Sequence, residues 1–67
     1  MSVAKITELS AASDVSFDDA IRLAVARASK TLKNITGAWV QDQKVDIRDG
    51  EIVRYRVNLK LSFILED

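Results

Sequence analysis

The last part of the chain alternates between apolar and polar positions. From Val53 to Leu65, every odd position is apolar and the even positions between them are mostly polar. A period of two is typical of a strand that buries one face and exposes the other. The pattern therefore predicts a strand over about Glu51–Leu65 whose odd-numbered side chains face a core.

A second period, close to that of an α-helix, runs through the second quarter of the chain. Apolar residues recur three or four positions apart, and the stripe consists of Phe17, Ala20, Ile21, Ala24, Val25, Ala28 and Leu32. Ser16 is a good N-cap, and Asp18 and Asp19 suit the positive end of the helix dipole. The pattern predicts a helix over about residues 16–33, with small alanines that let a sheet approach closely.

Two shorter segments predict the remaining strands, at about Val3–Ser10 and Ala38–Arg48. Asp49-Gly50 follows the second of them and is a strong signal for a two-residue hairpin turn. Such a turn sets the register of the two strands that it joins. The predicted pairs are Arg48 with Glu51, Gln43 with Arg56, Gln41 with Asn58, Val40 with Leu59, Trp39 with Lys60 and Ala38 with Leu61.

The order of these elements predicts the topology. A strand, a returning helix and another strand place the first two strands parallel, so an antiparallel sheet must have the third strand in its middle. The fold class is α+β, in β-α-β-β order, with a three-stranded antiparallel sheet wrapped around one helix. A single domain spans residues 1–67. The third strand, roughly 45–50 Å long, is expected to extend beyond a helix of about 25 Å.

The composition points to association with further copies of the chain. A chain of 67 residues buries little surface on folding, and without Cys it forms no disulfide. The absence of His removes the commonest metal ligand and general base. Equal numbers of acidic and basic residues argue against nucleic-acid or membrane partners. Since the sequence has neither a membrane-length apolar segment nor a signal peptide, we expect a cytoplasmic location.

No nucleophile–base pair is visible in the sequence. Tyr55 is one of the few groups able to act as an acid or base, and it falls in the core-facing row of the last strand. We therefore expect a protein that is not an enzyme.

The outward-facing row of the sheet carries the first candidate binding residues. Trp39 is suited to stacking on a flat aromatic ligand, or to a contact between subunits with Lys60 over its ring. Arg54, Arg56 and Lys60 suit the phosphate or carboxylate groups of a nucleotide-like ligand, or acidic residues of neighbouring subunits. Both interpretations of each group remain open from the sequence.

Two further groups of candidates lie on that same face and near the hairpin, respectively. Gln41, Gln43 and Asn58 are able to recognise the edge of a heterocycle, or to satisfy one another across an interface. A set of acidic residues supplies oxygen ligands of the kind that calcium prefers, although turns and surfaces use the same residues. These are Asp42, Asp46, Asp49 and Glu51.

Taken together, the elements resemble the dodecin family. The resemblance covers nearly the whole chain and depends on the spacing of several segments. They are Ser16–Ala20, Ala24–Lys33 with Ala26-Arg27-Ala28 at its centre, Asn34-Ile35 and Tyr55–Asp67. The resemblance implies a hollow homododecamer that binds flavins (riboflavin, FMN or FAD) at two-fold contacts and stores them. It also implies two weaker alternatives, since some members bind coenzyme A and a subgroup resembles calcium-binding proteins without the flavin site.

The chain departs from the flavin-binding members at two positions. Their stacking Trp falls on Gly37, and Trp39 lies two residues later, on the same face and about 7 Å along the strand. Their flavin-binding Gln falls on Arg56, which offers hydrogen-bond donors only. The predicted cofactor site comprises Gly37, Trp39, Gln41, Gln43, Arg56 and Asn58. The leading function is flavin binding and storage, and the alternative is a dodecin-like shell without flavin, acting as a calcium-binding or structural oligomer.

Overall fold

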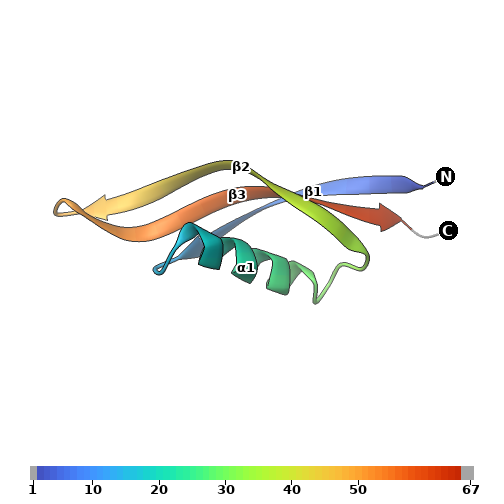
Figure 1. The fold of residues 1–67 in the computed structure, drawn as a ribbon, viewed down its shortest axis with the longest axis horizontal. Coiled ribbons are helices and arrows are strands. Elements are labelled where there is room, and N and C mark those ends of the chain that lie inside the picture. The colour runs from blue at the N-terminus through green and yellow to red at the C-terminus, as the bar shows by residue number, and fades with distance from the viewer. Residues whose placement is uncertain (1, 66–67) are drawn as a thin grey trace.

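The computed structural model describes residues 2–65, and these form one helix against one side of a three-stranded sheet (Figure 1). The elements are β1 (Val3–Ser13), α1 (Phe17–Ala28), β2 (Ile35–Arg48) and β3 (Glu51–Leu65). Their order across the sheet is β1-β3-β2, and β3 is antiparallel to both neighbours. The predicted β-α-β-β fold, with the last strand in the middle, is therefore confirmed.

The helix begins where the sequence predicts and ends earlier. The Ser16 hydroxyl accepts a hydrogen bond from the Asp19 backbone N–H at 2.9 Å, which caps the N-terminus. Regular helix ends at Ala28, not near residue 33, because the N–H groups of Lys30 and Thr31 turn to carbonyls three residues back. The Ser29 hydroxyl also donates to the Val25 carbonyl at 2.7 Å. Bonds to carbonyls three residues back tighten the last turn, as is common at helix C-termini.

Both outer strands are longer than their alternation predicts. β1 continues to Ser13, which pairs with Tyr55, and β2 begins at Ile35, which pairs with Phe63. Asn34 is in the left-handed region at φ 62°, and β2 starts directly after it. Pairing with the long central strand thus extends segments whose own patterns are weak.

The core lies between the middle of β3 and the alanine stripe of α1. Val57, Leu59 and Leu61 are buried, and they face a helix side formed by Ala20, Ala24 and Ala28. Alanines let the helix axis approach the sheet closely, so three large β3 side chains are covered by a helix of three turns. The prediction that odd-numbered β3 residues face the helix is confirmed for this stretch.

The hairpin turn is as predicted, but the register beyond it is not uniform. Asp49 and Gly50 have φ values of 52° and 80°, as a two-residue hairpin turn of type I′ requires. The predicted pairs at each end of the hairpin are confirmed, including Trp39 with Lys60. Two β-bulges lie between them, one in each strand, so the register slips by one residue and then returns.

The slip makes two predicted pairs wrong. Asn58 pairs with Asp42 instead of Gln41, and Arg56 pairs with Lys44 instead of Gln43. The turn determines register only while both strands stay regular, and alternation alone does not reveal an extra residue in each strand. Because the two bulges compensate, the pairs at the ends of the hairpin give no sign of the slip between them.

The sheet is much longer than the helix that covers it. The described chain extends 52 Å along its longest axis and 13 Å along its shortest. The β2–β3 hairpin projects past the N-terminal end of α1, and the start of β1 and the end of β3 lie at the opposite end of the sheet (Figure 1). Over residues 2–65, no helix is long and apolar enough to cross a membrane.

Candidate ligand-binding site

The sheet face opposite the helix carries three rows of side chains across all three strands. The pairings of β3 with its neighbours define these rows. They are Glu8–Lys60–Trp39, Ser10–Asn58–Asp42 and Ala12–Arg56–Lys44. Residues that are directly opposite in an antiparallel sheet have neighbouring side chains, so each row is one local surface.

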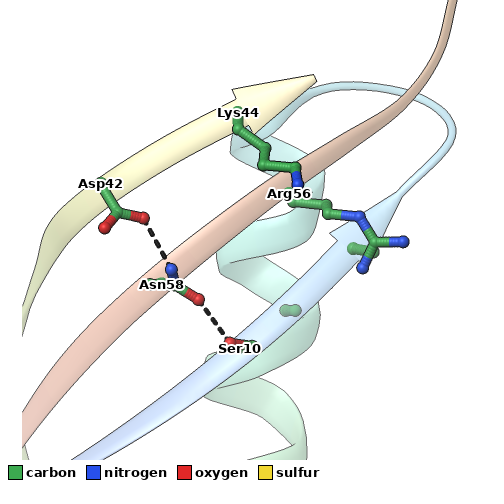
Figure 2. Close-up of a pocket in the computed structure, with 7 residues that line it drawn as sticks. Ser10, Asp42, Lys44, Arg56 and Asn58 are labelled. Carbon is green, nitrogen blue, oxygen red and sulfur yellow. Dashed lines mark hydrogen bonds between the residues drawn. The ribbon is translucent and has the colours of Figure 1, made fainter. Parts of the chain in front are cut away.

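The middle row is joined by hydrogen bonds. Asn58 Nδ2 donates to Asp42 Oδ1 at 2.6 Å, and the Ser10 hydroxyl donates to Asn58 Oδ1. Figure 2 shows these two bonds in line across the three strands, with Lys44 and Arg56 on the next row. These two hydrogen bonds form a polar ladder of Ser10, Asn58 and Asp42. The ladder fixes the orientation of the Asn58 amide and uses one donor and one acceptor of its side chain.

A hollow of about 340 Å³ opens over the second and third rows. Its lining combines the polar ladder, the two cations and small side chains from β1. The lining residues are Ser10, Ala11, Ala12, Asp42, Lys44, Arg56 and Asn58. Such a hollow offers hydrogen-bonding and charged groups along one edge and little bulk along the other, which suits a polar part of a small ligand.

Charge in the third row is only partly balanced. Lys44 and Arg56 are directly opposite each other, and like charges in that position repel. Arg56 Nε donates to Asp46 Oδ2 at 2.9 Å, with 44% of the Arg56 side chain exposed. The Lys44 side chain forms no hydrogen bond or ion pair with the residues that the structure describes. The row therefore keeps a positive charge beside the hollow.

The predicted cofactor residues separate into two groups. Gly37, Trp39, Asn58 and Arg56 lie on rows of the outer face, with Gly37 opposite Ser62 and next to the Trp39 row. A Cβ on Gly37 would lie 3.2 Å from the Ser62 hydroxyl oxygen, so a larger side chain would displace that hydroxyl. The structure thus brings four of the six predicted residues to one face.

The two glutamines are placed differently. Gln41 is the extra residue of a bulge and has no partner on β3. Gln43 pairs with Val57, which is buried against the helix, so its Cβ is on the helix side of the sheet. Asp42 and Lys44 occupy the outer positions instead. The sequence did not predict these two on the outer face, because the bulge that moves them there carries no recognisable signal.

The acidic residues near the hairpin do not gather. Within residues 2–65, no three acidic side chains lie close enough together to hold a metal ion. The Asp46 carboxylate forms an ion pair with Arg56, and the Asp42 carboxylate accepts a hydrogen bond from Asn58, so both already bind side chains of β3. Arg54 turns to a separate hollow that Asp14 and Asp19 also line. Residues 2–65 of one chain therefore hold no complete calcium site.

A second hollow lies on the helix side, between α1 and β1. It measures about 400 Å³ and its lining is mostly apolar, including Leu9, Leu23, Ala24 and Leu32. Leu23 projects from the helix and is exposed. This groove has the character of a packing surface, in contrast to the polar hollow across the sheet.

Comparison with solved structures gives close matches over the whole chain. The dodecin of Streptomyces coelicolor is 36% identical, with a TM-score of 0.92, and the match covers 98% of this chain and 94% of that one. A variant of the Thermus thermophilus dodecin is 33% identical, with a TM-score of 0.94 and full coverage of both chains.

A third match is the calcium dodecin of Mycobacterium tuberculosis, described as a calcium-chelating immunodominant antigen with a novel calcium-binding site. It is 31% identical, with a TM-score of 0.82, and the match covers 96% of this chain and 91% of that one. No curated protein matches the sequence. The family profile described as Dodecin matches residues 3–66. The chain therefore belongs to the dodecin family.

Proposed function

We propose that this chain assembles with copies of itself, as a homododecamer, and binds and stores flavin between subunits without chemical conversion. The observation that carries the proposal is the outer face of the sheet, where exposed Trp39 lies one row from the polar hollow. A stacking ring beside fixed polar groups is the arrangement that a flat heterocycle with a polar arm requires.

Self-assembly is supported by the apolar ends of the sheet. At the hairpin end, Ile47 pairs with Ile52, and these side chains are 65% and 52% exposed. At the other end, Val3 pairs with Leu65, and both are exposed. Clusters of this kind mark surfaces that bind protein, and the apolar groove between α1 and β1 offers a further one.

The exposure of the site supports binding between subunits. Trp39 lies on an exposed sheet face, and most of the residues that line the hollow beside it belong to that same face. One chain therefore supplies one side of the site. A second copy facing it would enclose the ligand, as binding sites ordinarily enclose most of the surface of a small molecule.

The test is a fluorescence titration of the assembled protein with riboflavin and with FMN. We expect quenching at micromolar protein for at least one flavin. Trp39→Ala should weaken that binding about fivefold, since aromatic stacking is worth about 1 kcal/mol. Trp39→Phe keeps a ring and serves as the control. No quenching by the wild-type protein at tens of micromolar would overturn flavin storage.

Calcium is the second candidate ligand, favoured by the similarity to the calcium dodecin of Mycobacterium tuberculosis. Asp42 and Asp46 lie on the open face, where a second copy is able to complete a set of oxygen ligands. Binding to the folded state raises the melting temperature. A melting temperature that rises with calcium, but not with magnesium at the same concentration, would support this candidate. An unchanged one would remove it.

A further inference from the structure

We infer that the Asp49-Gly50 turn is a site of spontaneous backbone modification, at which Asp49 converts to isoaspartate and thereby loosens the end of the β2–β3 hairpin. Neither flavin nor any other ligand takes part. The reaction involves only the two turn residues and water, and it acts on an aspartate to which the binding face gives no role.

The two reacting groups are free at the tip of the hairpin. The Asp49 carboxylate makes no hydrogen bond or ion pair with a residue that the structure describes, and the Gly50 N–H donates no hydrogen bond to one. Both residues are exposed, and no atom lies within 4 Å of the place where a Gly50 Cβ would stand. The turn that joins β2 and β3 lies beyond the helix (Figure 1). Neither packing nor hydrogen bonding therefore restrains these groups.

The turn is also able to leave its native conformation. Asp49 has φ 52°, in the left-handed region that L-residues occupy at a cost in free energy. Only two residues form the turn, and the first pair that holds it is Arg48 with Glu51. Loop tips open at a lower free energy than the paired interior of a sheet. The tip therefore samples open conformations in which Asp49 and Gly50 approach each other.

Gly50 is the residue type that obstructs the reaction least. Attack of its nitrogen on Asp49 Cγ closes a five-membered ring, and groups joined in one chain react at a high effective concentration. Because Gly lacks a Cβ, its nitrogen is unhindered and its backbone adopts conformations closed to other residues. Asp46 differs, since its carboxylate is paired with Arg56 and the β-branched Ile47 follows it within the paired strand. Asp46 is thus a control within the same chain.

The reaction is an isomerisation that needs no reagent besides water. As the N–Cγ bond forms, the carboxyl C–OH bond breaks, and the hydroxyl leaves with the amide proton as water. The product is a cyclic imide. Water then adds to the main-chain carbonyl carbon of Asp49, the bond from that carbon to the Gly50 nitrogen breaks, and the nitrogen takes a proton. The chain now continues through Cγ, and the former main-chain carbonyl is a free carboxylate.

The new linkage is incompatible with the native turn. It inserts the Asp49 Cβ into the main chain, whereas a two-residue turn of type I′ requires the ordinary backbone at both positions. The turn sets the register of the strands that it joins. The nearest pairs are Arg48 with Glu51 and Ile47 with Ile52. We expect the modified chain to lose these pairs first, and with them the apolar end of the hairpin.

The test is incubation of the assembled wild-type protein in warm, neutral buffer for several weeks, followed by peptide mapping with a fragmentation method that distinguishes the two linkages. We expect isoaspartate to accumulate about tenfold faster at Asp49 than at Asp46, the factor that a difference of about 1.4 kcal/mol in opening free energy gives. Asp49→Glu requires a larger ring and should stay unmodified. Asp49→Asn keeps a residue that this turn favours, reacts by loss of ammonia, and should gain mass as its amide becomes an acid.

Hydrogen exchange of the purified modified protein tests the structural effect. Amide exchange should be faster than in the native protein at Ile47 and Ile52 and unchanged at Leu59. Equal rates of modification at Asp49 and Asp46, or no mass gain in Asp49→Asn, would overturn the site. So would modification confined to a dissociated Ile52→Asp variant, because the turn would then be covered in the assembled protein. Native exchange in the modified protein would overturn the loosening of the hairpin.

Discussion

The middle of β3 and its hairpin end belong to one strand but differ in what covers them. Leu59, in the middle, is 1% exposed beneath the helix, whereas Ile52, near the turn, is 52% exposed. Both are large apolar residues on a strand of 15 residues, roughly 50 Å long. The helix has 12 residues and is about 18 Å long, so it covers only the middle. The strand thus carries large apolar side chains beyond the part that the helix of one chain covers.

The difference has a structural cause at the hairpin. The bulge between Asp46 and Ile47 places Ile52 opposite Ile47, with Val53 as the extra residue. Without it, Ile52 would stay on the side of Arg54. The bulge therefore joins two isoleucines in one apolar pair beyond the end of the helix. We interpret this pair as a surface for another subunit.

The largest predicted effect comes from the covered region. Leu59→Ala leaves a cavity beneath the alanine stripe and should lower the free energy of unfolding by about 3 kcal/mol. Leu59→Met keeps most of the volume and should cost less than about 1.5 kcal/mol. Chemical denaturation of both variants provides the measurement. Equal, small losses would mean that the middle of the sheet is not the core.

The next effect decides what covers the hairpin. On a lone chain, Ile52→Asp is a surface change worth within about 0.5 kcal/mol. In an interface it buries an unpaired charge, so we expect about 2 kcal/mol of lost stability and dissociation into smaller species. Size-exclusion chromatography with light scattering detects the change, and Ile52→Val should stay assembled. An Ile52→Asp variant of unchanged size and stability would place the hairpin outside the interface.

A smaller effect on stability is expected from a substitution in the hairpin turn itself. Gly50 has φ 80°, and no atom lies within 4 Å of where its Cβ would stand. Gly50→Ala therefore costs backbone strain alone, about 1 kcal/mol, and should leave assembly unchanged. Thermal unfolding measures the cost. A loss of several kcal/mol would indicate that the turn contacts another subunit.

The smallest effect concerns the exposed ion pair on the open face. Asp46→Asn removes the partner of Arg56 and should change stability by less than about 0.5 kcal/mol, because the pair is well solvated. Denaturation at low and high salt measures it. A cost above about 2 kcal/mol would mean that a second copy buries the pair.

Much of this fold follows from local sequence patterns. The alternation of β3 and the Asp49-Gly50 turn predict the central hairpin, and Ser16 predicts the start of the helix. The extent of the outer strands is set by pairing with β3, and the helix ends in a tightened turn whose N–H groups bond to carbonyls three residues back. Such effects are tertiary or depend on local hydrogen bonding, so a periodic pattern does not contain them.

The binding face was predicted less completely than the fold. Trp39, Asn58 and Arg56 belong to the outer face as expected, because alternation and the turn place them there. Asp42 and Lys44 replace the two glutamines because one bulge exchanges the faces of neighbouring residues over a short stretch. An insertion of one residue in the pairing leaves no mark on composition or period, so only the structure locates these side chains.

We expect copies of the chain to complete the sheet that one helix leaves partly uncovered. Multi-angle light scattering of the wild-type protein at micromolar concentration measures this assembly. We predict a single species whose mass is that of the homododecamer, far above the 7.5 kDa of one chain. A 7.5 kDa species with native circular dichroism and cooperative unfolding would show that one chain is stable without further copies.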